Sequence, residues 1–273
     1  MILSAVTISL VPEAKGGPFV FWNDLADGCS KASALGFDAV EVFPRSPEEF
    51  DAERLRQLLV KHNLKLAGMG TGAGWVAQKL RLTDPDVEIR RRAREFAGAI
   101  IDLAGGFGAP AIIGSMQGRW GDGVTREQAL AWMAEALEEL GPRARTHGVP
   151  VLVEPLNRYE TNLFNRVAET LEFLKTLRTR EVKLLCDLFH MNIEEVDIAA
   201  ALRLAGENLG HVHFVDSNRL APGFGHTDLK PIAQTLHDMG YAGCVSAEVL
   251  PLPDPESAAR QTMVAFRKLF RPQ

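Results

Sequence analysis

The sequence predicts a single α/β domain, a TIM (β/α)8 barrel that spans residues 1–273. The length suits one barrel domain, which commonly takes about 250 residues. Short apolar runs alternate with amphipathic segments from end to end, which is the pattern that builds parallel sheets, and eight such units can be counted. An open, doubly wound sheet is the main alternative. It usually carries a nucleotide-binding fingerprint after its first strand, and the sequence SLVPEAKGG at that place has none.

The eight expected strands are short and rich in Val, Ile, Leu or Ala. In chain order they are Ser4–Ser9, Asp38–Phe43, Leu64–Met69, Ala109–Ser115, Val149–Pro155, Lys183–Asp187, Gly210–Val215 and Cys244–Val249. Amphipathic patterns between them predict helices at Ser46–His62, Asp84–Ala104, Arg126–His147, Val167–Leu177, Val196–Ala205 and Asp254–Phe270. Two glycine-rich stretches, 68–75 and 114–123, follow the third and fourth strands, and we expect them to form loops on the active face.

The composition excludes several classes of protein. With 46% hydrophobic residues, 24% charged residues and a net charge of -5, the chain is typical of a soluble globular domain. The mild acidity argues against a nucleic-acid partner, because such proteins usually carry a basic face. Cys29, Cys186 and Cys244 lie far apart, so neither a disulfide framework nor a thiolate zinc site is expected, which fits a reducing cytoplasm. No apolar run is long enough to span a membrane and no export signal is recognised, so no membrane partner is expected.

The most informative feature is that each of the last four strands ends with one ionisable residue. These residues are Glu154, Asp187, His213 and Glu248, spaced by about one βα repeat each. Because side chains alternate along a strand, the residues that face the other way are uniformly apolar and must meet the helices. The polar set therefore points into the barrel mouth at the carboxyl ends of the strands, where barrel enzymes place their chemistry.

Three carboxylates that converge on one enclosed place predict a bound cation. Left unpaired, each would cost of the order of several kcal/mol to bury. Three oxygen donors and one imidazole suit one divalent metal ion, with Mn²⁺ as the first choice and Co²⁺ or Mg²⁺ as alternatives. The other interpretation is that these are ordinary polar groups of a barrel interior, paired through lysines such as Lys183.

At these residues the sequence resembles the ketose 3-epimerase family, the relatives of D-tagatose and D-psicose 3-epimerase within the xylose isomerase-like TIM barrels. The resemblance lies in EPLNRYE (154–160), DLFHMNIEE (187–195) and HVHFVDSNRLAPGFGHTD (211–228). The continuation NRYETNLFN is also similar to 5-keto-L-gluconate epimerases of the same group. The first 120 residues resemble the family in barrel layout only, because VPEAKGGPFVFW replaces its usual aromatic-rich loop after the first strand.

Carried over position by position, the resemblance implies a set of site residues. The implied metal ligands are Glu154, Asp187, His213 and Glu248, with Glu154 and Glu248 also acting as the acid/base pair. Glu160, His190 and Arg219 are implied to contact sugar hydroxyls. The implied partner is a small-molecule keto-sugar, and a homo-oligomer is a further expectation.

The residues taken alone agree with this chemistry. Removing a proton beside a ketone carbonyl creates an enediolate, and a metal that holds both oxygens stabilises its charge. Inversion then needs proton donors on two faces, which two carboxylates on the fifth and eighth strands could supply. We therefore predict a metal-dependent isomerase that inverts the carbon next to the carbonyl of a free keto-sugar or keto-sugar acid through a metal-bound cis-enediolate.

Several alternatives stay open at this point. A hydroxypyruvate-type or other aldose–ketose isomerase, or an inosose-type dehydratase, could use the same site. A repair endonuclease is disfavoured, because it would require several metals, more histidines and a basic groove for DNA. A non-catalytic metal barrel is a further alternative, but it would not need paired carboxylates. The sequence leaves undecided whether Glu41, Arg119 or Trp120 reaches the site, and it favours His211 as a hydrogen-bond partner of a ligating carboxylate. Unphosphorylated substrates are expected, because Lys15 beside two glycines is weak support for a phosphate cradle.

Overall fold

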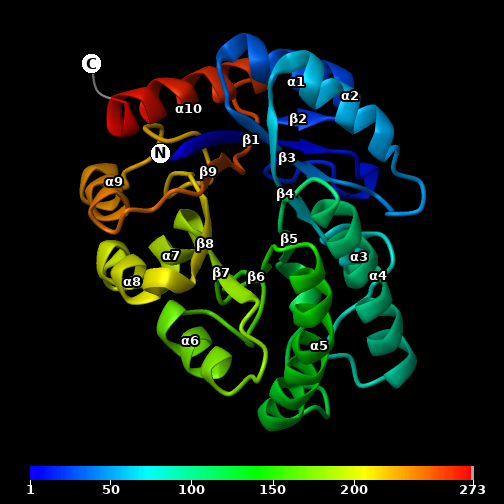
Figure 1. The fold of residues 1–273 in the computed structure, drawn as a ribbon. Helices are drawn as coiled ribbons and strands as arrows, with labels where there is room; N and C mark the ends of the chain where they lie inside the picture. Colours follow the sequence, from blue (N-terminus) through cyan, green and yellow to red (C-terminus); the bar gives the residue numbers. More distant parts are fainter. Residues whose placement is uncertain (272–273) are drawn as a thin grey trace.

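The protein, described by a computed structural model over residues 1–271, forms a closed barrel of eight parallel strands surrounded by helices (Figure 1). The remaining residues of the expected domain, 272 and 273, lie outside the described part. The barrel strands follow one another in chain order, and the last pairs with the first, which confirms the predicted TIM barrel. They are β1 (Leu3–Ser9), β3 (Ala39–Phe43), β4 (Lys65–Gly70), β5 (Ala111–Ile113), β6 (Val151–Val153), β7 (Val182–Asp187), β8 (Leu209–His213) and β9 (Cys244–Ala247).

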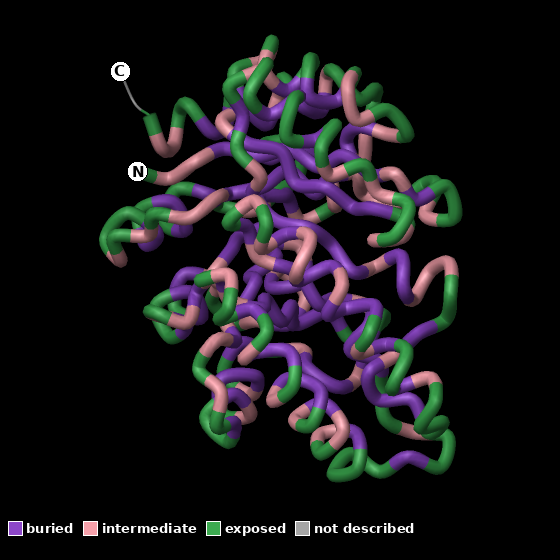
Figure 2. Tube along the Cα trace, turned by 45° about the vertical axis from the view of Figure 1, so that its right-hand side comes forward, coloured by how far each residue is buried: buried purple, intermediate pink, exposed green. Residues whose placement is uncertain are grey.

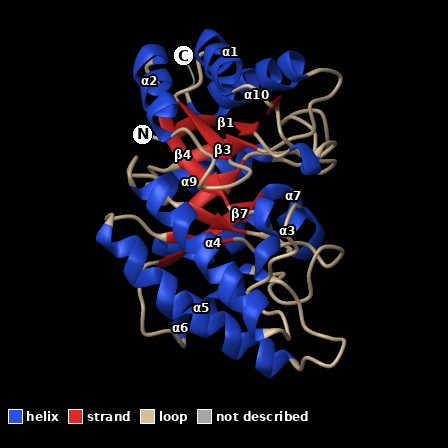
Figure 3. Cartoon of the chain, turned by 90° about the vertical axis from the view of Figure 1, so that its right-hand side faces the viewer, coloured by secondary structure: helices blue, strands red, loops and turns tan. Residues whose placement is uncertain are grey.

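Helices cover the outside of the barrel, so that the strands form its centre (Figure 3). The α-helices are α1 (Leu25–Leu35), α2 (Ala52–His62), α3 (Ala73–Val76), α4 (Val87–Gly105), α5 (Arg126–Thr146), α6 (Val167–Lys175), α7 (Leu188–Glu194), α8 (Ile198–Ala205), α9 (Leu229–Asp238) and α10 (Pro255–Phe270). Short 3-10 turns occupy Pro12–Ala14, Ser115–Gln117 and Gly206–Asn208, and the two-residue strand β2 (Phe21–Trp22) pairs with the end of β1.

Several helices start later than the sequence patterns predict. The helix expected from Ser46 begins at Ala52, because the Asp51 carboxylate accepts the backbone N–H of Arg54 and caps the first turn there. In the same way Asp86 caps α4 and Asp197 caps α8. The glycine-rich stretch 68–75 was expected to be a loop, but it contains the end of β4 and the short helix α3.

The strand alternation separates two kinds of interior. Val151, Val153 and Leu184 belong to the large apolar core between barrel and helices, whereas Leu152 and Leu185 pack with Ile112 in a small cluster of their own. Buried residues accordingly form the inner part of the molecule, and exposed residues lie along its outside (Figure 2). The polar strand ends thus share the inner side of the barrel.

Within residues 1–271, no helix has both the length and the apolar character needed to cross a membrane.

Candidate active site

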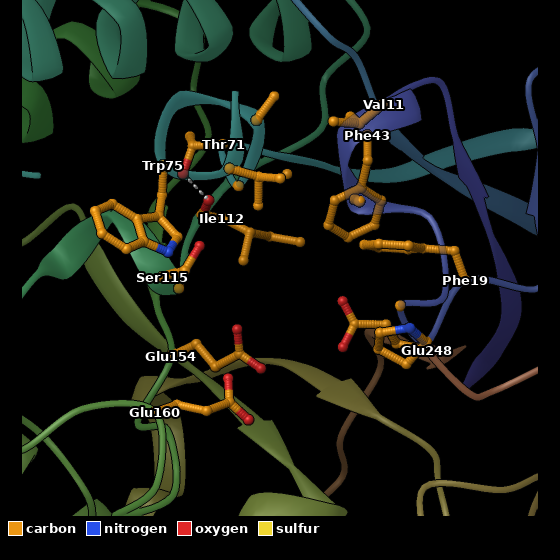
Figure 4. Close-up of a pocket in the computed structure, with 18 of the residues that line it drawn as sticks. Val11, Phe19, Phe43, Thr71, Trp75, Ile112, Ser115, Glu154, Glu160 and Glu248 are labelled. Carbon is orange, nitrogen blue, oxygen red and sulfur yellow. Dashed lines mark hydrogen bonds between the residues drawn. The ribbon is translucent and has the colours of Figure 1, made fainter. Parts of the chain in front are cut away.

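A cavity of about 550 Å³ opens at the carboxyl ends of the strands, a size within the usual range of small-molecule sites. Five of the seven site residues predicted from the sequence line it: Glu154, Glu160, His190, Arg219 and Glu248. The apolar side chains of the wall are mainly those of Val11, Phe19, Phe43, Trp75 and Ile112 (Figure 4). Glu13 and Lys15 also line the cavity, so the wall away from the strand ends combines apolar and charged side chains.

The four predicted metal ligands lie together on neighbouring strands. Glu154 follows β6, Asp187 ends β7, His213 ends β8 and Glu248 follows β9, and all four are buried. One ligand atom from each lies within 4.8 Å of the ligand atoms of the others. His213 Nδ1 lies 3.0 Å from Asp187 Oδ2, 3.3 Å from Glu248 Oε2 and 3.4 Å from Glu154 Oε1. Three carboxylates and one imidazole nitrogen thus converge as expected.

This group fits a divalent cation. Among the described residues, the buried oxygen Glu154 Oε1 has no hydrogen-bond partner, which is costly for a carboxylate unless something else satisfies it. The donor set of carboxylate oxygens with one imidazole is the kind that Mn²⁺, Mg²⁺ or Co²⁺ accepts. The four side chains could therefore hold one metal ion.

Two of the carboxyl groups have opposite pKa shifts. Burial raises the pKa of Glu154, and the nearby charge of Glu248 raises it further, while His213 only partly offsets these effects. Burial alone would also raise the pKa of Asp187, but Arg219, His190 and His213 together outweigh it and hold that pKa well below its usual range. The two buried carboxyl groups therefore lie in different electrostatic environments.

Glu41 and His211 stand behind His213 inside the barrel. Glu41 is completely buried on β3, and its two oxygens face His211 Nε2 at 2.7 Å and His213 Nε2 at 3.1 Å. A proton on His213 Nε2 shared with Glu41 leaves the Nδ1 lone pair directed at the carboxylates. His211 was expected to hydrogen-bond a ligating carboxylate. That expectation was wrong, because its partner Glu41 lies outside the predicted ligand set.

Arg219 reaches the site from the loop between β8 and α9. Its guanidinium pairs with Asp187 and Glu248 and lies over the ring of Phe189, 5.1 Å from the ring centre. Its backbone has a φ of 64°, in the left-handed region that residues other than glycine rarely adopt. A positively charged side chain thus pairs with two of the carboxylates. The alternative interpretation of the sequence expected a lysine such as Lys183 in this role, but the structure has Arg219 there.

Asp216 organises the same loop from its buried position. The carboxylate accepts the backbone N–H groups of Ser217 at 2.7 Å, Gly223 at 2.7 Å and Thr227 at 3.0 Å. Burial alone would raise the pKa of Asp216, but these N–H donors outweigh it and lower the pKa. The loop that carries Arg219 is thus held by an ionised side chain.

Glu154 needs a glycine beside it. Gly114 directly follows β5, and a Cβ atom at this position would lie 2.6 Å from Glu154 Oε2. Gln117 Nε2 donates to the carbonyl oxygens of Gly114 at 3.1 Å and of Glu154 at 2.9 Å, which ties the two strand ends together. The space for the Glu154 carboxylate therefore depends on the missing side chain of Gly114.

The structure also answers which of the undecided residues reach the cavity. Arg119 and Trp120 do not line it, and the Trp120 indole N–H donates to the carbonyl of Asn162 at 2.8 Å instead. Sequence reasoning missed the apolar wall of Phe19, Phe43 and Trp75, and it missed Gly114. The aromatic residues of PFVFW, 18–22, were the available signal for Phe19, but nothing in the sequence indicated which of them faces the cavity.

Comparisons with known proteins show the family to which the chain is similar. The family model described as "Xylose isomerase-like TIM barrel" matches residues 29–269. D-psicose 3-epimerase of Enterocloster bolteae is 30% identical over 240 residues, which cover 84% of this chain and 80% of that relative. L-ribulose 3-epimerase of Methylomonas sp. is 29% identical over 267 residues, covering 93% and 91% of the two chains. Crystal structures of D-psicose 3-epimerase with D-tagatose from Clostridium cellulolyticum H10 share the fold, with a TM-score of 0.80, 24% identity and coverage of 99% and 100%.

Proposed function

This chain belongs to the ketose 3-epimerases, isomerases within the xylose isomerase-like TIM barrel family, and we propose that it inverts the carbon next to the carbonyl of a free keto-sugar or keto-sugar acid. The observation that carries the proposal is the placement of two glutamates. In Figure 4 the carboxylates of Glu154 and Glu248 point toward each other from opposite sides of the cavity. A substrate carbon held between them could lose its proton to one carboxylate and regain a proton from the other.

The two glutamates would exchange roles with the direction of the reaction. In one direction Glu248 takes the proton from the substrate carbon, and Glu154 returns a proton to the opposite face. In the reverse reaction Glu248 donates and Glu154 accepts. Each face of the planar intermediate then meets a different carboxyl group, which produces inversion.

Other residues would bind and orient the substrate. Glu160 lies at the cavity wall with its side chain about half exposed, where it can accept a hydroxyl hydrogen bond. Arg219 can donate to a substrate oxygen and offset the negative charge that develops there. A divalent cation held by Glu154, Asp187, His213 and Glu248, Mn²⁺ by first choice, would supply Lewis-acid stabilisation of that charge.

The substrate class is inferred from relatives of this chain and from the cavity. Their names include D-psicose 3-epimerase and L-ribulose 3-epimerase, so the shared chemistry acts on ketoses of different length. The carboxylates at the strand ends suit the carbonyl and its neighbouring hydroxyls, and the mixed wall that includes Glu13, Lys15 and Phe19 is left for the distal carbons and their hydroxyls. A cytoplasmic location and a homo-oligomer remain predictions from the sequence.

A substrate panel tests the proposal. The Mn²⁺-loaded protein is incubated with free ketohexoses, ketopentoses, keto-hexonates and one inosose, and the products are identified by chromatography and NMR. We expect at least one ketose or keto acid to give its epimer at the carbon beside the carbonyl. Formation of an aldose, loss of water from the inosose, or no reaction with any ketose would contradict the proposal.

A further inference from the structure

Asn157 joins two of the residues that face the substrate. It lies in the loop after β6 and is only 2% exposed. Its Nδ2 atom lies 2.8 Å from His190 Nδ1 and 3.0 Å from Glu160 Oε1. Because an amide NH₂ group has two hydrogens, it can donate one to each of these side chains.

The orientation of this amide follows from a third contact. The backbone N–H of Tyr159 donates to Asn157 Oδ1 at 3.0 Å, and an N–H group can donate only to the oxygen of an amide. The nitrogen must therefore face His190 and Glu160. The opposite orientation would also place the amide oxygen against the Glu160 carboxylate.

A second donor points at the same ring nitrogen of His190. The backbone N–H of Asn157 donates to His190 Nδ1 at 3.3 Å, in addition to the side-chain amide. Two N–H donors directed at Nδ1 require a lone pair there, because a proton on Nδ1 would face both of them. The carboxylate oxygen Glu160 Oε1 lies 3.8 Å from Nδ1, beyond hydrogen-bond distance. The proton of a neutral His190 then resides on Nε2.

The free end of the ring faces the reacting groups. His190 is buried and lines the cavity, and its Nε2 atom lies 3.8 Å from Glu154 Oε1. With the proton on Nε2, the imidazole presents a hydrogen-bond donor to the cavity beside Glu154. Such a donor can hold a substrate oxygen on which negative charge develops.

We propose that Asn157 is a positioning residue that fixes His190 as the Nε2–H tautomer, so that His190 acts on the substrate as a hydrogen-bond donor rather than as a base. The same amide holds Glu160 by its second hydrogen. The role of His190 toward substrate rests on the proposed epimerase function, whereas its tautomer does not.

The tautomer can be measured directly. Long-range ¹H–¹⁵N correlation spectra of the Mg²⁺-loaded protein distinguish a protonated from an unprotonated ring nitrogen, and the His190→Gln variant identifies the His190 signals by their loss. We expect an unprotonated Nδ1 and a protonated Nε2. A protonated Nδ1 in the wild-type protein would overturn the proposal.

The Asn157→Asp variant tests whether Asn157 is the cause. It keeps the size of the side chain but replaces the donor at 2.8 Å from Nδ1 with a charged acceptor. The backbone N–H at 3.3 Å stays, but the nearer carboxylate is the stronger partner, so Nδ1 should become protonated. A neutral ring protonated at Nδ1 has no proton on Nε2, so kcat and kcat/KM should both fall by about 10²–10³-fold, as for loss of one oxyanion donor. An unchanged His190 tautomer in this variant would contradict the proposal.

Two further variants separate this effect from general damage. Asn165 donates to the carbonyls of Leu156 at 2.7 Å and Thr161 at 3.1 Å in the same loop, so Asn165→Asp should disturb the loop while leaving the His190 tautomer unchanged. In a Glu160→Gln background, Asn157→Asp no longer repels a carboxylate, and a loss of similar size there assigns the effect to His190. If wild-type His190 has the expected tautomer but no ketose reacts, the positioning role stands and the epimerase function fails.

Discussion

Replacing Gly114 with alanine should displace the Glu154 carboxylate without unfolding the barrel. The new Cβ would lie 2.6 Å from Glu154 Oε2, whereas ordinary contacts of a Cβ atom begin at 3.4 Å. The shift required is about 0.8 Å, the difference between these two distances. The hydrogen bonds of Gln117 to both backbones hinder the strand ends from separating, so we expect the carboxylate to move.

The size of the effect follows from this shift. A misplacement of about 1 Å in a reacting group can lower turnover by about 10²-fold, which corresponds to about 2.7 kcal/mol of activation free energy. Disturbing the geometry of one metal ligand should also weaken metal binding, by about 10–100-fold. Because the change is confined to one small contact, the midpoint of thermal unfolding should fall far less than the activity.

The assay compares Gly114→Ala with a matched glycine variant. Turnover of the best ketose is measured at saturating Mn²⁺, Mn²⁺ affinity is measured by titration calorimetry, and unfolding is followed by circular dichroism. Gly106 at the end of α4 has a helical φ of -61°, and a Cβ there would meet its nearest atoms at 3.4 and 3.6 Å, so Gly106→Ala should behave as wild type. Wild-type turnover and metal affinity in Gly114→Ala would refute this account of how Glu154 is positioned.

Three further predictions follow from the site. Chelation should abolish activity and lower the unfolding temperature, and Mn²⁺ or Co²⁺ should restore both; activity that persists in protein shown to be metal-free by elemental analysis would contradict the metal assignment. Replacing Glu160, His190 or Arg219 singly with alanine should reduce turnover more than metal content, and normal turnover after resupplying metal would remove these residues from the substrate site. Asp216→Asn should lower the free energy of unfolding at neutral pH by about 1–3 kcal/mol, because the amide nitrogen cannot accept a backbone N–H. The pKa of Asp216 is lower in the folded protein than in the unfolded chain, where it is about 3.9. The stabilisation by its carboxylate is therefore present above the unfolded pKa and is lost as pH falls through the folded pKa, so the stabilities of wild type and variant should converge in acid denaturation curves. A difference in stability that stays constant with pH would contradict this.

The repeat pattern of the sequence was enough to predict the barrel and the meeting of Glu154, Asp187, His213 and Glu248. Each of these residues ends or directly follows a short strand, and parallel strands bring their carboxyl ends to one side of a barrel. The strand pattern therefore predicts both the end of the barrel at which these four side chains lie and the direction in which they point.

The contacts between distant segments could not be predicted in this way. Glu41 meets His211 across 170 residues of sequence, and only the closure of the barrel brings the two together. Asn157 and His190 meet because the loop after β6 folds over α7, and no periodic pattern describes that path. Helix starts were displaced because capping aspartates lie inside segments whose composition also suits a helix.

If two carboxylates on opposite faces exchange protons with one substrate carbon, solvent deuterium must enter at that carbon. The reaction is run in D₂O with the Mn²⁺-loaded wild-type protein and with the Glu154→Gln and Glu248→Gln variants, each of which keeps an oxygen that can bind metal. We expect one solvent deuterium at the inverted carbon of the wild-type product, and a fall in inversion of about 10²–10⁴-fold in each variant. Inverted product without deuterium, or near wild-type inversion by both metal-loaded variants, would contradict this exchange by two carboxylates.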